Sequence, residues 1–164
     1  YRSFLKRQVP GLEEKLKGGK FVNTKGEVLG EHQGYPFYTI GQRKGLGIAL
    51  GYPAFVLEIH PDTNTVVLGT EEELVRNGMT VGQLNLQKYP HLPEGTEALT
   101  KIRYRDPGAF AKLYQRSEDE VRVEFQGHVK GVAPGQSAVF YEGDDLIGGG
   151  IILFSSFGES QKRP

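Results

Sequence analysis

Three cations and a tyrosine stand close together in the stretch from Thr100 to Pro107. On a β-strand, alternation places Lys101, Arg103 and Arg105 on one face at a spacing of about 7 Å, close to the phosphate repeat of a single nucleic-acid strand. Tyr104 points to the other face of an ideal strand, although near a strand end it could swing out and stack on a base. The stretch predicts a nucleic-acid contact. The alternative is a solvated strand face with Tyr104 in the core.

A second candidate site is the loop from Gly30 to Ala49, where glycines frame the neighbouring residues Gln42, Arg43 and Lys44. Glycines allow a backbone to approach a ligand closely, and the glutamine offers both a donor and an acceptor. The two cations can meet phosphate, the arginine with a planar fork and the lysine as a point charge. The spacing fits neither a Rossmann fingerprint nor a Walker A loop. A turn with solvated charges is the alternative, and composition by itself favours it.

A third candidate is Gln136, which follows a Pro-Gly turn at Pro134-Gly135 and precedes an apolar run. Its amide could read a base edge, whereas a glutamine in a turn usually contacts water. Farther along, Gly148-Gly149-Gly150 enters another apolar run. Consecutive glycines in a strand are typical of a bulge or a tight barrel corner, so we expect a structural role for them.

Residue types for catalysis are sparse in this chain. There is no cysteine, which excludes disulfides, thiolate zinc sites and a cysteine nucleophile. The four histidines have neither metal-ligand spacing nor a serine-centred signature beside them; they are His32, His60, His91 and His128. We therefore expect no catalytic residue, metal site or cofactor within the chain. A self-contained enzyme using His32 and the basic loop is the least favoured hypothesis.

Charge and hydropathy narrow the class of protein. Twenty Lys and Arg balance twenty Asp and Glu, so any affinity for nucleic acid must come from local patches rather than from a global field. No apolar run approaches the roughly 20 residues of a spanning helix, and the first residues lack the apolar stretch of a signal peptide. We expect a soluble, cytoplasmic, monomeric protein with no membrane contact.

The elements that must position these residues are mainly strands, because 23 glycines and 9 prolines without a period suit many short strands and tight turns. We predict a mostly β protein, with a small central β-rich domain containing short helices over residues 1–78 and a six-stranded antiparallel β-barrel over 79–164. Short helical pieces are expected before Leu16 and over 71–77, and hairpins over 19–30 and 54–69. The barrel strands are predicted near 80–86, 97–104, 110–115, 120–125, 137–141 and 147–154.

The order of these motifs resembles one known family. The glycine-framed loop, Lys101–Arg105, Ala133–Gln136 and Gly148–Ile152 occur in sequence, as they do in the tRNA-specific 2-thiouridylases, and the resemblance runs from end to end. In that family an ATP-binding PP-loop domain precedes a small central domain and a C-terminal β-barrel. The resemblance implies that the full enzyme activates the C2 oxygen of the wobble uridine with ATP and then delivers persulfide sulfur from a cysteine. It also implies that Tyr1–Leu5 follows the second catalytic cysteine, so the ATP site lies in an N-terminal domain outside this chain.

The resemblance further implies which residues contact tRNA. Arg103, Tyr104 and Gln136 match family positions that touch the anticodon arm, and Gln42–Lys44 would lie on the loop nearest the reactive centre. Ala133 departs from the family, which more often has threonine there. The chain is thus expected to bind tRNA without turnover. The alternative is a structural or protein-interaction barrel that contacts a sulfur-carrier protein.

Overall fold

The computed structural model describes residues 11, 14 and 16–156. The chain divides into two compact units, Tyr1–Leu74 and Val75–Pro164, and the first unit ends a few residues before the position expected from the sequence. Strands dominate both units, which confirms the mostly β class. The helical pieces expected before Leu16 fall almost wholly outside the described residues. Within the described part of the chain, no helix is long and apolar enough to cross a membrane.

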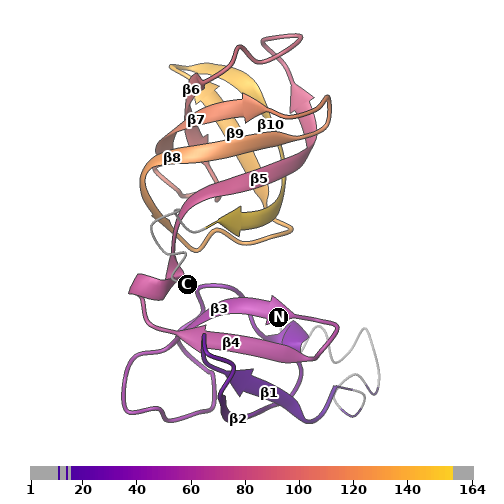
Figure 1. The fold of residues 1–164 in the computed structure, drawn as a ribbon, viewed down its shortest axis with the longest axis vertical. Coiled ribbons are helices and arrows are strands. Elements are labelled where there is room, and N and C mark those ends of the chain that lie inside the picture. The colour runs from indigo at the N-terminus through magenta and orange to yellow at the C-terminus, as the bar shows by residue number, and fades with distance from the viewer. Residues whose placement is uncertain (1–10, 12–13, 15, 157–164) are drawn as a thin grey trace. The chain divides into compact units, whose positions relative to one another are not determined.

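The first unit is a four-stranded sheet with the order β2-β1-β4-β3 (Figure 1). Both predicted hairpins are confirmed, because β1 pairs antiparallel with β2 and β3 pairs antiparallel with β4. The parallel pairing of β1 with β4 joins the hairpins, and this long-range contact has no local sequence signal. The strands are β1 (Gly19–Val22), β2 (Val28–His32), β3 (Phe55–His60) and β4 (Thr65–Gly69).

The glycine-framed loop is packed onto this sheet. Its 3-10 helix η1 (Tyr35–Phe37) and Leu46 bury apolar side chains against Phe21 and Val56 of the sheet. The main chain of the loop also pairs with β3, because the Gly41 amide donates to the Val56 carbonyl at 2.8 Å and the Val56 amide donates back to Gln42 at 2.9 Å. The loop is therefore held by core contacts and by hydrogen bonds to β3, while Arg43 and Lys44 stay exposed.

The short helical piece predicted over 71–77 is confirmed only in part. One 3-10 turn, η2 (Glu72–Leu74), is followed at once by β5 (Val75–Leu86). The turn is held by a reciprocal cap, in which the Thr70 amide donates to the Glu73 carboxylate at 2.8 Å and the Glu73 amide donates to the Thr70 hydroxyl at 3.4 Å. The chain then pairs with the end of β8, and this pairing with a distant strand overrides a weak local helix preference.

The second unit is a closed six-stranded antiparallel barrel with the order β10-β5-β8-β7-β6-β9 (Figure 1), as predicted. Alternate residues fill its core, so that Val121 and Val123 are fully buried while Arg122 between them is exposed. The remaining strands are β6 (Thr96–Lys101), β7 (Ala109–Gln115), β8 (Val121–Lys130), β9 (Ser137–Glu142) and β10 (Asp145–Ser156). Register shifts on both sides of Gly148-Gly149 confirm the predicted bulge.

Strand β6 ends at Lys101, three residues before the predicted end. The chain turns because the Asp106 carboxylate accepts a hydrogen bond from the Gly108 amide at 3.1 Å, while the Asp106 amide donates to the Arg103 carbonyl at 3.1 Å. Pro107 cannot donate to a ladder, and Gly108 takes a φ of 90°. The prediction that Lys101, Arg103 and Arg105 share one strand face is therefore wrong, because the two arginines lie in the turn.

Candidate functional site

A groove of about 680 Å³ lies on the barrel where the turn after β6 approaches the start of β9. It brings together four residues that the sequence singled out, although more than 30 positions separate Gln136 from the others. Arg105 is exposed but does not line the groove. The lining residues are Lys101, Ile102, Arg103, Tyr104, Gly135, Gln136, Ser137, Val139 and Tyr141. We call this site the barrel groove.

Tyr104 stands at the edge of the barrel groove with 99% of its surface exposed. The alternative that placed this ring in the core is wrong, because the turn after Lys101 carries Tyr104 away from the barrel interior. An aromatic ring held in solvent beside a groove can stack on an unpaired nucleobase of any type. Because the ring is exposed, it contributes nothing to the core, and both of its faces are available for a ligand.

Arg103 is fixed at the groove by one hydrogen bond. Its Nη2 donates to the Lys130 carbonyl at 2.5 Å, and the absence of a side chain at Gly131, whose φ is 69°, leaves room for the guanidinium. A guanidinium has five N–H donors in a planar fork. One donor thus holds the side chain in position while the remaining donors can meet a phosphate.

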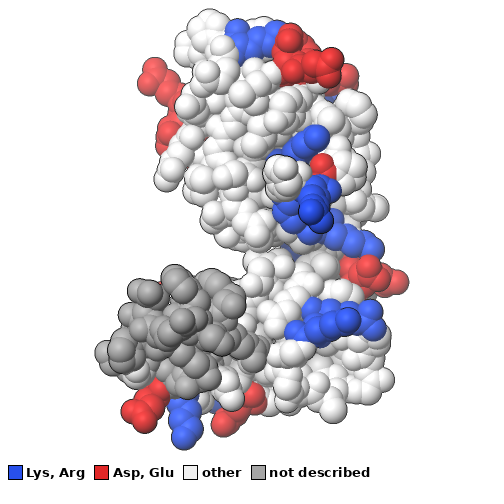
Figure 2. Space-filling model, turned by 180° about the vertical axis from the view of Figure 1, so that it is seen from behind, with Lys and Arg blue, Asp and Glu red and all other residues white. Residues whose placement is uncertain are grey.

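Lys101 supplies the second cation of the barrel groove. It is the last residue of β6, is paired with Val139 of β9, and lies with its Nζ 5.7 Å from the centre of the Tyr141 ring. This cation–π contact holds the ammonium over β9. Among the described residues that line the groove, the two charged side chains are both positive. Figure 2 shows Lys and Arg in small separate groups on one face of the molecule, which agrees with the expectation of local patches.

Gln136 enters the groove from the start of β9. Its main chain is held on both sides, since its amide donates to the Ala133 carbonyl at 3.3 Å and its carbonyl accepts from the Ile152 amide at 2.8 Å. Its side-chain Oε1 is buried and has no hydrogen-bond partner in the described part of the chain. A buried acceptor without a donor carries a desolvation cost, which an N–H group of a bound ligand would remove.

The basic loop of the first unit gives its three predicted residues different roles. Arg43 lies over the Phe55 ring, with Cζ 5.9 Å from the ring centre, and Lys44 is exposed. The Gln42 side chain closes the loop, because Oε1 accepts from the Thr39 amide at 3.1 Å and Nε2 donates to the Lys44 carbonyl at 3.0 Å. Gln42 therefore positions the loop, and the two cations remain for contact with a ligand.

Replacing Gln42 with alanine is expected to loosen this loop. The change removes both side-chain hydrogen bonds, each contributing about 1 kcal/mol, so the amides of Gly41 and Val56 should exchange with solvent about tenfold faster or more. Hydrogen exchange followed by NMR measures this directly. Gln33→Ala is the matched control, because Gln33 is an exposed glutamine of the same loop. Equal exchange rates in the two variants would contradict the loop-closing role.

The histidines and carboxylates do not form a metal site in the part of the chain that the structure describes, since no group of three or more potential ligands is close enough together. His32 is buried between the rings of Phe21 and Tyr38, with centroid distances of 4.9 and 5.1 Å. Its Nδ1 accepts a hydrogen bond from the Gly34 amide at 3.0 Å. Burial lowers the pKa of His32, so the neutral ring acts as a packing residue of the first unit.

Some residues of the barrel groove escaped the sequence analysis. Ser137, Val139 and Tyr141 line it from β9, and their side chains lie beside Lys101 because β6 pairs with β9. These two strands are far apart in the chain, and each of the three residues reads as an ordinary strand residue. They could have been identified from the alternation along β9: buried Ala138 and Phe140 face the core, so the residues between and beside them face outward.

Comparison with known proteins agrees with this organisation. Residues 2–70 match the family model described as tRNA methyl transferase PRC-barrel domain, and residues 76–152 match the one described as Aminomethyltransferase beta-barrel domain. The chain is 60% identical over 156 residues to the tRNA-specific 2-thiouridylase MnmA of Cytophaga hutchinsonii, covering 94% of the chain and 42% of that relative. It is 59% identical over 156 residues to the same enzyme of Amoebophilus asiaticus, covering 94% and 41%.

A third relative, the tRNA-specific 2-thiouridylase MnmA of Salinibacter ruber, is 49% identical over 152 residues, which are 93% of the chain and 40% of the relative. The chain thus spans about two fifths of the length of the curated relatives it matches. The two domain matches follow each other along the chain and together take in both compact units. By its sequence, the chain belongs to the tRNA-specific 2-thiouridylase family.

Proposed function

We propose that this chain is the tRNA-binding, C-terminal portion of an ATP-dependent enzyme that thiolates the wobble uridine of tRNA. The observation that carries the proposal is the convergence of Lys101, Arg103, Tyr104 and Gln136 on one groove. The names of the relatives supply the substrate class, tRNA. On this proposal ATP binds in an N-terminal domain outside the chain, and the residues of the chain position the RNA rather than transfer sulfur.

The chemistry of the barrel groove suits the single-stranded part of an anticodon arm. The Lys101 ammonium and the free donors of the Arg103 guanidinium can bind phosphates, which sets the position of the strand. Tyr104 can stack on an unpaired base, and the buried Gln136 oxygen can accept a hydrogen bond from a base edge. Single-stranded loops are where proteins read RNA, because a folded RNA helix hides its base edges in a deep groove.

The dependence of binding on salt tests this proposal. Two phosphate contacts predict that log K falls with log salt with a slope of about 1.4 to 1.8, at roughly 0.7 to 0.9 per contact. Lys101→Ala should lower the slope by about 0.7 to 0.9. The measurement is fluorescence anisotropy of a labelled anticodon stem-loop titrated with the chain at several salt concentrations.

Lys112→Ala is the matched control for the salt experiment. Lys112 is an exposed lysine on β7 and does not line the barrel groove, so its removal should leave the slope unchanged. If the wild-type chain shows no salt-sensitive binding, the proposal fails. It also fails if both lysine variants lower the slope equally, because binding would then be a diffuse effect of charge.

A protein-interaction role, with a sulfur-carrier protein as partner, is the second candidate function. It is supported by an apolar row that crosses four strands on the outside of the barrel, in which Leu99 is paired with both Phe110 and Tyr141, and Tyr141 with Leu146. Phe110 and Leu146 are 62% and 44% exposed, and exposed apolar rows often mark a protein contact. Absence of salt-sensitive RNA binding would favour this candidate.

A further inference from the structure

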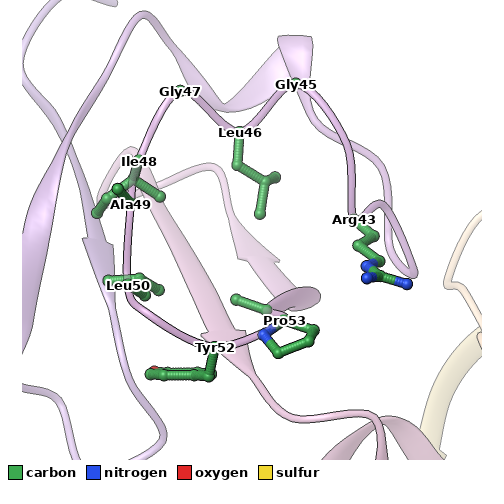
Figure 3. Close-up of a pocket in the computed structure, with 10 residues that line it drawn as sticks. Arg43, Gly45, Leu46, Gly47, Ile48, Ala49, Leu50, Tyr52 and Pro53 are labelled. Atoms are coloured by element: carbon green, nitrogen blue, oxygen red, sulfur yellow. The ribbon is translucent and has the colours of Figure 1, made fainter.

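A second concavity, of about 420 Å³, lies in the first unit under the curved segment from Arg43 to Ala54 (Figure 3). We call this segment the arch. Ligand pockets of a few hundred Å³ take small molecules or single residues of a polymer, and this one has room for one nucleoside. Its lining residues are Arg43, Gly45, Leu46, Gly47, Ile48, Ala49, Leu50, Tyr52, Pro53 and Ala54.

The shape of the arch is built into its backbone. Gly45, Gly47 and Gly51 have φ values of 70°, 75° and 74°, in the left-handed region that favours glycine. Between them, Leu46 is buried in the core of the sheet, and Ile48 and Leu50 pack against the same core. Alternating anchors and glycine bends thus hold the pocket open before any ligand arrives, which lowers the entropic cost of binding.

The main chain of the arch presents unused hydrogen-bonding groups. Within the described residues, no hydrogen bond involves the backbone from Leu46 to Gly51, in contrast to the bonded segment around Gln42. Free N–H and C=O groups beside a pocket can recognise a flat ligand that carries both donors and acceptors on its edge. A nucleobase is such a ligand.

The ends of the arch add an aromatic ring and a cation. Tyr52 lies at the rim with 46% of its surface exposed, and Arg43 stands at the other end, positioned by the Phe55 ring. Among the described lining residues, Arg43 carries the charge and none is acidic. The site therefore favours a ligand that combines a planar ring with a negative group.

We propose that the arch binds one unstacked nucleotide of RNA. Tyr52 stacks on the base, the free backbone groups from Leu46 to Gly51 hydrogen-bond its edge, and Arg43 binds the adjoining phosphate. The inference rests on the proposed function in taking RNA as the ligand, and it adds a second contact point in the other unit of the chain. An aliphatic side chain of a protein partner fits less well, because it would desolvate those polar backbone groups without bonding them.

The test is an NMR titration of the isotope-labelled chain with the four ribonucleoside 5′-monophosphates, each added separately. At least one should shift the amide signals of Leu46–Gly51 in a saturable manner, at millimolar concentration. Tyr52→Ala should weaken that binding by about fivefold or more, since base–aromatic stacking is lost. Phe154→Ala is the matched control, because it removes an exposed aromatic ring that lines neither the arch nor the barrel groove and should leave the affinity of the arch unchanged.

Ribose 5-phosphate and N-acetyl-leucinamide complete the experiment as ligands without a base. If ribose 5-phosphate shifts the same amides equally well, the arch binds phosphate alone and the inference is overturned. If N-acetyl-leucinamide shifts them and no nucleotide does, the arch is a peptide site and the inference is likewise overturned. Neither result changes the outcome of the salt experiment on Lys101. A wrong inference about the arch can therefore be told apart from a wrong proposal about the barrel groove.

Discussion

Replacing Gly150 with alanine is expected to lower the free energy of unfolding of the barrel by about 3 kcal/mol, the upper end of the range for overpacked sites. A Cβ at Gly150 would overlap the Gly82 carbonyl oxygen and crowd a Val81 methyl group at 2.8 Å. Backbone atoms cannot rotate away as a side chain can. Because β10 is paired with β5 on one side and β9 on the other, relief of the overlap would disrupt hydrogen bonds that close the barrel.

The two neighbouring glycines show that every residue of Gly148–Gly150 must lack a side chain. A Cβ at Gly149 would lie 2.5 Å from the Ala138 carbonyl oxygen on the β9 side, and one at Gly148 would overlap the Asn85 carbonyl oxygen on the β5 side. The three glycines therefore let β10 lie close to both neighbours at the bulge. Urea denaturation followed by circular dichroism measures the loss of stability.

Gly127→Ala is the matched control for the Gly150 experiment. Gly127 also lies in a barrel strand, β8, but a Cβ there meets no atom within 4 Å. This substitution should be neutral or slightly stabilising, since alanine restricts the unfolded chain more than glycine does. If Gly150→Ala and Gly127→Ala have the same stability, close backbone approach does not explain the triple glycine.

Replacing Tyr104 with alanine is expected to weaken binding of an anticodon stem-loop by about thirtyfold, the middle of the range for loss of one base–aromatic stack. Stability should not change, because 99% of the side chain is exposed and no packing is lost. This combination separates a binding role from a structural one. Anisotropy titration gives the affinity, and denaturation of the same variant checks its stability.

Phe154→Ala is the control for Tyr104. Phe154 is an aromatic residue of β10 that is 55% exposed and lies outside the barrel groove, so its removal should leave RNA affinity unchanged. If Tyr104→Ala binds the stem-loop as tightly as the wild-type chain, the ring does not stack on a base. An equal loss in both variants would indicate nonspecific contact with exposed aromatic surface.

The fold was predictable where the sequence pattern is local. The alternation of apolar and charged residues in Val121–Phe125 matches the inward and outward side chains of β8, and the hairpin predicted over 54–69 is the β3–β4 pair. The predictions were wrong where pairing with a residue far away in the sequence determines the local structure. Val75 begins a strand rather than continuing a helix because it pairs with Lys130, and no local pattern announces a partner 55 residues away.

The candidate site was predictable as residue types but not as a geometry. Lys101, Arg103 and Tyr104 were identified on the assumption of a strand, yet the strand stops and a turn capped by Asp106 carries the two later residues. Their approach to Gln136 follows from the pairing of β6 with β9. Closure of the barrel depends on pairing between strands that are far apart in the sequence. The sequence therefore identified the side chains of the groove but not their proximity.

The arch was missed for a different reason. The sequence shows the cations of the loop and the close approach that its glycines allow, but it does not show that Leu46 is an anchor in the core or that Tyr52 stands at the rim. A single tyrosine between a glycine and a proline, as in Gly51-Tyr52-Pro53, gives no functional signal in a sequence. The tyrosine lies beside unbonded backbone groups because the arch bends at glycines with positive φ values, and this bend is known only from the structure.

The most direct test of tRNA docking is an NMR titration of the isotope-labelled chain with an unlabelled anticodon stem-loop. The amide signals of residues 101–104 and 135–141, which include the groove residues, should shift in a saturable manner, and added salt should reverse the shifts. If those signals stay in place while the stem-loop binds elsewhere, or if no signal shifts at low salt, the barrel groove is not the docking site and the account is contradicted.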